Sequence, residues 1–281
     1  MIQLIALDLD DTLLKTDLTI SKRNLQAIKK AEELGILIVL ASGRTIRSMQ
    51  RYVTELGLDS KPGYIISDNG STLSSTAPAE ILVSHVLENS LLGRLFDAFE
   101  KFDLPVQVYH QGKILVTKEN PHTHIDEKLS GYQRLVTPRL KHEIPFLPSK
   151  LVVPGDPEIL PGVLAQVREL FGNQINAFIS KPYFLEVLPA GADKGTALQA
   201  ICERTHIPSE NVLAFGDAAN DIGMIRYAGW GVAMANAIPE LKQLARLVTL
   251  NTNENDGVAE ILEQRVLPLR TAENGTIGHL A

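Results

Sequence analysis

The sequence predicts an α/β protein in which a doubly wound, mainly parallel sheet is interrupted by a second, α+β domain. Short apolar runs of strand length alternate with amphipathic helical stretches near both ends of the chain, as in right-handed βαβ units. In the middle of the chain the order changes to a helix followed by paired strands, and this order occurs twice. We therefore divide the 281 residues into a discontinuous core, 1–85 and 188–281, and an inserted domain, 86–187.

The first core elements follow from their apolar runs. Ile2–Leu7 is almost continuously apolar and ends in acidic residues, which is typical of a strand buried in a parallel sheet. Ser21 can cap a helix that ends at Gly35. The same reasoning predicts strands at Ile36–Leu40 and Tyr64–Ser67, with an amphipathic stretch between them that reaches Gly57.

The inserted domain is predicted from helices and hairpins, after a short hairpin of Thr72–Leu73 with Ile81–Val83. Its predicted elements are helices Leu91–Phe102 and Ile159–Phe171, strand Lys150–Val153, and two hairpins, Val106–Tyr109 with Lys113–Thr117 and Ile175–Ser180 with Tyr183–Leu188. The core then returns with Lys194–Arg204, Val212–Phe215, Asn220–Tyr227, Gly231–Met234 and Pro239–Leu244. We expect the residues from Asn274 onward to be poorly ordered.

Composition narrows the class of protein. Hydrophobic residues make up 44% and charged residues 21%, which is ordinary for a globular protein. The 27 Lys and Arg against 33 Asp and Glu give a charge of −6, which disfavours nucleic acid as a partner. A single cysteine, Cys202, excludes an internal disulfide and is expected in core packing. No apolar run approaches the ~18 residues of a membrane span, so we expect a cytoplasmic protein without a membrane partner.

Two carboxylates follow the first strand. Asp8 and Asp10 alternate with Leu9, so both lie on one side of the extended chain. Ligands of an open α/β sheet bind beyond the carboxyl ends of its strands, where these side chains are expected. Two close carboxylates repel unless a cation or a proton lies between them, and Mg²⁺ suits oxygen ligands. The alternative is a solvated acidic turn before the next helix.

A second acidic cluster follows the strand Val212–Phe215. Asp217 ends that strand, and Asp221 lies four residues on, so both can share one face of a first helical turn. Asn220 offers an amide that can donate to a phosphate or to an oxygen of a metal site. The alternative is a plain helix cap with acidic residues favoured by the helix dipole. The pairing with Asp8 and Asp10 is what makes this cluster specific.

Hydroxyl, backbone and cationic groups complete a possible anion site. Ser42-Gly43-Arg44 follows the second core strand, and a hydroxyl with consecutive N–H groups at a helix start can cradle an anion, although it is often only a turn. Lys194 begins a helix, where its charge opposes the dipole unless an anion lies in front of it; a surface lysine is the alternative. Asn69 belongs to an Asn-Gly turn signal, and Lys181 lies in a predicted hairpin turn.

Together these motifs resemble the haloacid dehalogenase-like (HAD) superfamily, most closely its Cof-type, class IIB branch of sugar-phosphate and related phosphatases. The motifs appear in the family's order: Asp8-Leu9-Asp10-Asp11-Thr12-Leu13, Ser42-Gly43-Arg44, Lys194-Gly195 and Gly216-Asp217-Ala218-Ala219-Asn220-Asp221. The resemblance implies a Rossmann-like core with an inserted cap of the C2B type over nearly the whole chain. Asp11 stands where many members have glycine, and its side chain is expected to point away from the Asp8–Asp10 pair. Asp68 replaces the commoner glutamate.

The resemblance also implies roles. Asp8 is expected to be the nucleophile and Asp10 the acid and base, with a raised pKa so that it can donate a proton. Magnesium is expected at Asp8, the Asp10 backbone carbonyl and Asp217, with Asp221 holding metal-bound water or orienting Lys194. The phosphate ligands implied are Ser42, Gly43, Lys194 and Asn220, and the candidate substrate contacts are Arg44, Asn69 and Lys181.

These roles predict a magnesium-dependent phosphatase of small phosphorylated metabolites, with sugar phosphates as the first candidates. A phosphotransferase or phosphomutase on the same scaffold is one alternative, because it would also phosphorylate Asp8. A non-catalytic sensor of phosphorylated ligands is another. Release of inorganic phosphate without an acceptor separates the phosphatase from both.

Overall fold

The strand β1 (Leu4–Leu7) lies at the centre of the larger sheet, and all of its residues are fully buried. The computed structural model describes residues 1–268, so the prediction for residues from Asn274 lies outside the described part. β1 pairs in parallel with β2 (Leu37–Ala41) and with β12 (Val212–Gly216), which puts the first and last thirds of the chain in one sheet. A strand with parallel neighbours and helices on its faces must be apolar throughout, as β1 is.

The larger sheet has the order β14-β13-β12-β1-β2-β3-β4-β5, parallel up to β3 and antiparallel at the last two strands. This order confirms the predicted doubly wound, mainly parallel core and the hairpin that follows the third strand. The outer strands are β3 (Tyr64–Ser67), β4 (Thr72–Ser75), β5 (Ile81–Ser84), β13 (Trp230–Ala233) and β14 (Leu247–Val248).

The core helices begin where the sequence provides caps. The Ser21 side chain accepts from the N–H of Asn24 at the start of α1, and Asp193 caps α7 by accepting from Gly195 and Thr196. α7 packs against α8, and α1 packs against α10. The core helices are α1 (Lys22–Glu33), α2 (Ile46–Glu55), α7 (Lys194–Thr205), α8 (Ile222–Tyr227), α9 (Pro239–Leu244) and α10 (Gly257–Ile261).

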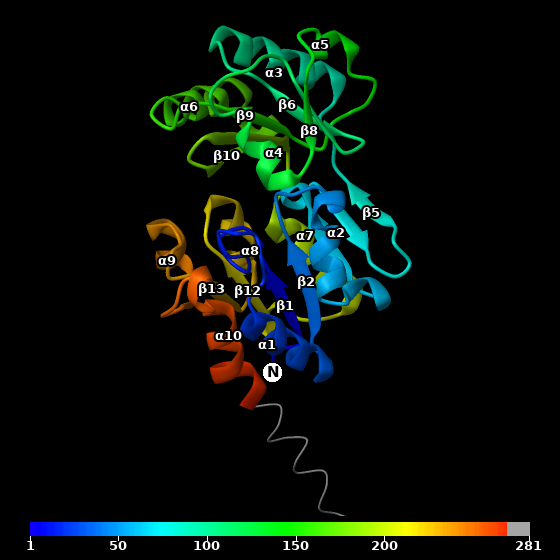
Figure 1. Ribbon diagram of the computed structural model, residues 1–281, viewed down its shortest axis with the longest axis vertical. Helices are drawn as coiled ribbons and strands as arrows, with labels where there is room; N and C mark the ends of the chain where they lie inside the picture. The colour runs from blue at the N-terminus through cyan, green and yellow to red at the C-terminus, as the bar shows by residue number, and fades with distance from the viewer. Residues whose placement is uncertain (269–281) are drawn as a thin grey trace, which may run out of the picture.

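A second sheet, with the order β10-β11-β9-β6-β7-β8, lies above the core together with its helices (Figure 1). We call the segment from α3 to β11 the cap. Its elements are α3 (Asn89–Lys101), β6 (Gln107–His110), β7 (Lys113–Val116), α4 (Ile125–Ser130), β8 (Gln133–Val136), α5 (Leu140–Glu143), β9 (Leu151–Pro154), α6 (Leu160–Phe171), β10 (Ile175–Lys181) and β11 (Phe184–Pro189).

The cap sheet is antiparallel apart from the parallel pair β7 and β8, so the predicted α+β character is confirmed. The structure adds α4, β8 and α5 to the predicted elements, and α4 lies on the side of the cap that faces the core (Figure 1). The division into 1–85, 86–187 and 188–281 stays a prediction, and β11 continues two residues beyond its second limit, to Pro189.

Core and cap have separate hydrophobic clusters. The core cluster is formed by the larger sheet and its helices, and the main cap cluster by α3, α6 and the inner cap strands. Cys202 is buried in the core cluster, which confirms its predicted packing role. No helix within residues 1–268 combines the length and the apolar composition that a bilayer crossing requires. A third, small cluster joins Phe178 and Leu188 of the cap to Ala192 of the core.

Candidate active site

Acidic side chains from two neighbouring strands meet above the larger sheet. Asp8 follows β1 and Asp217 follows β12, and the parallel pairing of these strands places both at the same edge. One carboxylate oxygen from each of Asp8, Asp217 and Asp221 lies within 4.8 Å of the others. The predicted convergence of the two acidic motifs is thus present in the structure.

Lys194, the first residue of α7, lies fully buried between two of these carboxylates. Its Nζ lies 2.5 Å from Asp8 Oδ1 and 2.6 Å from Asp221 Oδ1. Burial alone would lower the pKa of this lysine, but the Asp221 and Asp8 carboxylates raise it above its ordinary value. Lys194 is therefore a fixed positive charge next to Asp8, and the anion expected in front of this helix start is present.

Asp221 connects the lysine to the second acidic motif. Its Oδ2 accepts from the N–H of Asp217 at 3.0 Å and from the N–H of Ala218 at 3.1 Å, while its Oδ1 accepts from Lys194. The side chain is fully buried. Asp221 thus orders the turn that carries Asp217 and also contacts Lys194.

The carboxylate cluster has the properties of a divalent-cation site. Burial and the Asp221 charge raise the pKa of Asp8 to about 7, while Lys194 opposes the rise. Burial and the Asp8 charge raise the pKa of Asp217 well above its ordinary value. Crowded carboxylates of this kind are relieved by a hard cation with oxygen ligands, so the donor set fits Mg²⁺. The three carboxylates that converge are those of Asp8, Asp217 and Asp221. The Asp10 carboxylate is not among them, because it is paired with Arg44.

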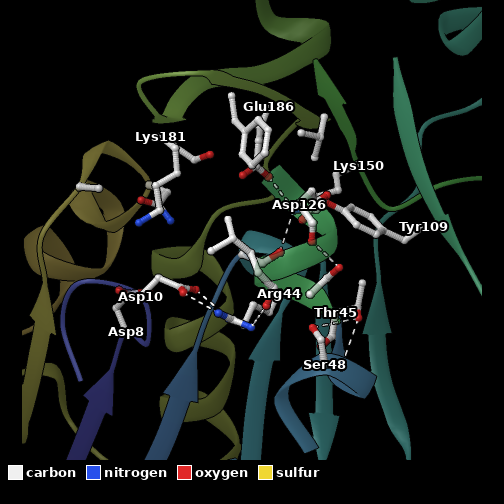
Figure 2. Close-up of a pocket in the computed structure, with 18 of the residues that line it drawn as sticks. Asp8, Asp10, Arg44, Thr45, Ser48, Tyr109, Asp126, Lys150, Lys181 and Glu186 are labelled. Atoms are coloured by element: carbon white, nitrogen blue, oxygen red, sulfur yellow. Dashed lines mark hydrogen bonds and ion pairs between the residues drawn. The ribbon is translucent and has the colours of Figure 1, made fainter. Parts of the chain in front are cut away.

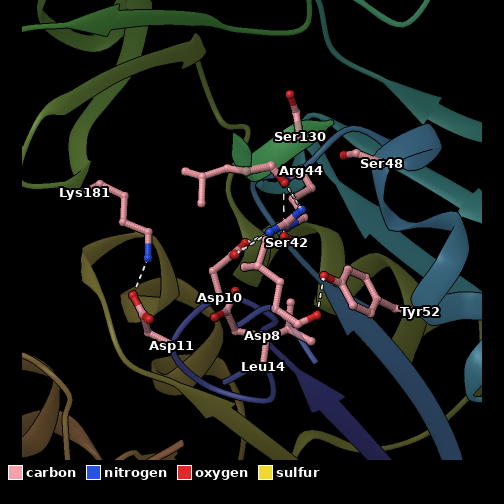
Figure 3. Close-up of polar contacts among 12 residues, drawn as sticks. Asp8, Asp10, Asp11, Leu14, Ser42, Arg44, Ser48, Tyr52, Ser130 and Lys181 are labelled. Atoms are coloured by element: carbon pink, nitrogen blue, oxygen red, sulfur yellow. Dashed lines mark hydrogen bonds and ion pairs between the residues drawn. The ribbon is translucent and has the colours of Figure 1, made fainter. Parts of the chain in front are cut away.

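Asp10 is paired with Arg44 (Figure 3). Arg44 Nε lies 2.8 Å from Asp10 Oδ2 and Nη2 lies 2.7 Å from Oδ1, while Nη1 donates to the carbonyl of Leu129 in the cap. The prediction of a raised pKa for Asp10 is wrong in this arrangement. Burial does raise the pKa, but the two hydrogen bonds and the charge of Arg44 lower it by more. Asp10 is therefore ionised, and its proton must come with a change in the Arg44 contact.

The four predicted phosphate ligands lie around this cluster. Ser42 is fully buried, and its Oγ accepts from the N–H of Arg44 at 3.1 Å. Gly43 packs so closely on Asn69 that an added Cβ would lie 2.9 Å from Asn69 Nδ2. Asn220 Nδ2 donates to Asn69 Oδ1 at 2.9 Å, and Asn220 Oδ1 is buried without a partner among the described residues. Lys194, the fourth predicted ligand, lies against Asp8.

A cavity of about 80 Å³ lies between this cluster and the cap (Figure 2). Among the predicted residues, Ser42, Lys194, Asp221 and Asn69 do not line it. Its walls come from both parts of the molecule: Asp8, Asp10, Gly43, Arg44, Asp217 and Asn220 from the core, and Tyr109, Asp126, Lys150, Lys181 and Glu186 from the cap.

Lys181 lines the cavity and also forms an ion pair with Asp11 of the first acidic motif (Figure 3). Burial lowers the pKa of Lys181, but the Asp11 carboxylate raises it above its ordinary value overall. Asp11 was expected only to point away from the Asp8–Asp10 pair. The structure gives it a partner in the cap, so the catalytic loop and the cap hairpin are tied together here.

The cap carboxylates and Lys150 were missed by sequence reasoning. Asp126 accepts from Gln107 Nε2 at 3.0 Å and also from the Tyr109 hydroxyl, and burial raises its pKa. Glu186 is a buried acid within the otherwise apolar strand β11, and Lys150 directly precedes the apolar strand β9. A charged residue within an apolar strand, or directly before one, is the signal that could have identified Glu186 and Lys150. Asp126 had no comparable signal.

Known proteins are similar to this chain in sequence and in fold over nearly its full length. Residues 5–262 match the family described as haloacid dehalogenase-like hydrolase. YxeH of Bacillus subtilis (strain 168) is 32% identical over 274 residues, covering 95% of this chain and 99% of YxeH. The 5-amino-6-(5-phospho-D-ribitylamino)uracil phosphatase YcsE of the same strain is 30% identical over 95% of this chain and 96% of its own. A crystal structure of a haloacid dehalogenase-like hydrolase from Bacteroides thetaiotaomicron is 33% identical, covers 94% of this chain and 99% of that chain, and has a TM-score of 0.83.

Proposed function

Because the chain belongs to the haloacid dehalogenase-like hydrolase family and is a phosphatase, we propose that it hydrolyses small phosphorylated metabolites through an aspartyl-phosphate on Asp8, with magnesium as cofactor. The observation that carries the proposal is the meeting of Asp8, Asp217 and Asp221 within 4.8 Å, with Lys194 against Asp8. A carboxylate nucleophile beside a fixed cation and a second strand's carboxylates is the arrangement that phosphoryl transfer through an enzyme acid requires.

The reaction proceeds in two displacements. Asp10 first takes a proton from solvent as its contact with Arg44 is released. An Asp8 oxygen then attacks phosphorus, the bond between phosphorus and the ester oxygen breaks, and the leaving oxygen takes that proton from Asp10. Asp10, now a carboxylate, removes a proton from water, which attacks phosphorus and breaks its bond to Asp8. Inorganic phosphate leaves and frees the Asp8 carboxylate, and Asp10 returns the proton taken from water to solvent when it pairs with Arg44 again. Asp10 suits the second step as it stands, because Arg44 keeps it ionised.

Charge neutralisation accounts for the remaining groups. When bound by Asp8, Asp217 and the Asp10 backbone carbonyl, Mg²⁺ supplies positive charge that offsets the repulsion between Asp8 and the phosphate. Asp221 orders the Asp217 turn and holds Lys194, whose ammonium faces Asp8. Ser42, the Gly43 N–H, Lys194 and Asn220 are the proposed ligands of the phosphoryl oxygens.

The cavity supports a hydroxyl-rich leaving group such as a sugar. Within residues 1–268, Asp126 accepts its hydrogen bonds through Oδ2 and Glu186 through Oε2, which leaves Asp126 Oδ1 and Glu186 Oε1 free. Both residues line the cavity. Free acceptors in a confined site favour a ligand that offers donors to them. We therefore keep sugar phosphates as the first candidates.

The test is phosphate release from a panel of phosphorylated metabolites with Mg²⁺, for the wild type and for Asp8→Asn. We expect release from the wild type without an acceptor, and none from Asp8→Asn, because an amide is no nucleophile towards phosphorus. Hydrolysis of p-nitrophenyl phosphate by Asp8→Asn at the wild-type rate would overturn the mechanism. Transfer to a second sugar in preference to release would assign a phosphomutase instead.

A further inference from the structure

A buried ion pair of the cap contacts the proposed phosphate ligand Gly43 directly and reaches a second one, Asn220, through Asn69. Lys150 and Glu186 are 4% and 5% exposed, and Lys150 Nζ lies 2.8 Å from Glu186 Oε2. Lys150 directly precedes β9, and Glu186 lies on β11, which pairs with β9. Glu186 stands opposite Val152 of β9, so the cap sheet fixes both side chains. Burial alone would lower the pKa of Lys150, but Glu186 and Asp68 raise it, which keeps the lysine charged. Such a pair gives little stability relative to an apolar pair of the same size.

From this pair a chain of hydrogen bonds reaches the core on both sides. Lys150 Nζ donates to the carbonyl oxygen of Gly43 at 2.7 Å. Glu186 Oε2 accepts from Asn69 Nδ2 at 2.8 Å, and Asn69 Oδ1 accepts from Asn220 Nδ2 at 2.9 Å. We call Lys150, Glu186, Asn69 and Asn220 the cap bridge. At one end of the cap bridge Lys150 contacts Gly43, and the other end is Asn220. Gly43 and Asn220 lie on different core loops, and both are proposed to bind the phosphoryl group.

We propose that the cap bridge positions the phosphoryl ligands, so that Lys150 and Glu186 act as positioning residues for phosphate binding. The Lys150 contact fixes the peptide plane after Gly43, and with it the segment that carries the Gly43 N–H. The Asn69 contact uses one hydrogen of the Asn220 amide and leaves the second directed elsewhere, available to a phosphoryl oxygen. The cap thereby sets core geometry, a function beyond covering the site. The proposal rests on the proposed function only for the identity of the bound group.

The electrostatics separate positioning from simple attraction. Lys150 and Glu186 have no net charge as a pair, so replacing both by apolar residues leaves the charge at the site unchanged. Replacing one leaves the other buried and unpaired, which destabilises the fold strongly. The informative variant is therefore the double one, Lys150→Met with Glu186→Leu, which removes the bridge and keeps a filled cap.

The experiment measures binding of inorganic phosphate in the presence of Mg²⁺ by calorimetry, together with thermal unfolding. We expect the double variant to melt at a higher temperature than either single variant, and its phosphate affinity to fall about 10- to 100-fold, as for the loss of other groups that orient ligands. Asn69→Ala added to the double variant should lower the phosphate affinity by less than it does in the wild type, because both changes act through the same Asn220 amide. Inorganic phosphate has no leaving group, so a lost sugar contact cannot explain the result.

Arg134→Met is the matched control. Arg134 is another partly buried cap cation, and its side chain contacts Glu119, Glu127 and Thr123, all within the cap. It should lower stability without changing phosphate affinity. Wild-type phosphate affinity in the stable double variant would overturn the proposal, as would failure of the wild type to bind phosphate. Phosphate binding by a wild type that releases no phosphate from any ester would overturn the proposed function alone.

Discussion

Arg44 sets the charge of Asp10. Its two hydrogen bonds outweigh the effect of burial and lower the pKa of the carboxyl. The same guanidinium donates to the Leu129 carbonyl, so the position of the cap and the charge of the acid–base residue depend on one side chain. An arginine suits this role because its planar guanidinium donates one hydrogen bond to each oxygen of the carboxylate.

We predict that Arg44→Gln moves the alkaline limb of the pH profile. Without the guanidinium, burial dominates and the pKa of Asp10 rises, so the acid form needed for the first displacement persists to higher pH. The kcat/KM of an alkyl phosphate, measured against pH, should show its alkaline limb at higher pH than in the wild type. Arg47→Gln is the control, because Arg47 contacts the Gln111 carbonyl and does not contact Asp10. An unmoved limb would contradict the assignment of Asp10.

The Asp8 pKa predicts a pH dependence of magnesium binding. Burial and Asp221 raise this pKa from 3.8 to about 7, and a metal must displace the proton below that value. Because the folded-state pKa is the higher one, the protein without metal loses stability as the pH rises through that interval, and magnesium reverses the loss. The rise in melting temperature on adding MgCl₂ should be larger at about pH 8 than at about pH 5.5. Asp8→Asn should abolish most of the difference.

At the scale of elements, the turn Asp68-Asn69-Gly70 lies directly against the start of α7. Gly70 has φ +91°, and a Cβ there would collide with the carbonyl of Asp193, the residue before Lys194. Only glycine therefore allows the β3 turn and the α7 start to approach this closely.

We predict that Gly70→Ala costs at least about 2 kcal/mol of folding free energy, because strain at positive φ adds to the collision. Gly57→Ala is the matched control: Gly57 has φ +74° and nothing within 4 Å of an added Cβ, so it should cost only about 1 kcal/mol. Urea unfolding of both variants gives the comparison. Equal losses would mean that the contact with Asp193 yields freely.

The elements that sequence reasoning predicted share a strong local signal. β1, β2 and β12 are continuous apolar runs followed by polar motifs, so both the strands and the positions of Asp8 and Asp217 could be predicted. The short elements α4, β8 and α5 have only partly buried, mixed sequences, and their form depends on packing in the cap. The Asp10–Arg44 pair could not be predicted, because it joins residues from two loops whose distance only the fold determines.

At the scale of the whole molecule, cap and core are joined by many polar contacts beside a small apolar one of Phe178, Leu188 and Ala192. Each part buries its own hydrophobic cluster, and the side chains between them include Arg44, Lys150 and the ion pair of Lys181 with Asp11. Polar contacts of this kind exchange readily with water, so opening of the cap would leave the two main hydrophobic clusters buried.

We predict that Lys181→Met raises the KM for phosphate esters about 3- to 10-fold while changing stability by less than about 1 kcal/mol, since the pair with Asp11 is partly exposed. Lys118→Met, which removes a cap lysine paired with the exposed Asp103, is the control. Asp11→Asn tests the ion pair itself. If Lys181→Met raises the KM and Asp11→Asn does not, the lysine acts on the substrate directly and the ion pair with Asp11 does not contribute to substrate binding.

The order of strands in the larger sheet also has a consequence for biosynthesis. β1 is hydrogen-bonded to β12, so its second neighbour emerges from the ribosome about 200 residues after it. The cap is built from one continuous stretch of the chain and can form on the nascent chain before β12 is made. During that time one edge of β1 has no neighbouring strand. A chaperone that shields apolar strands during translation should therefore bind chains stalled before Val212 and release those stalled well after Leu262.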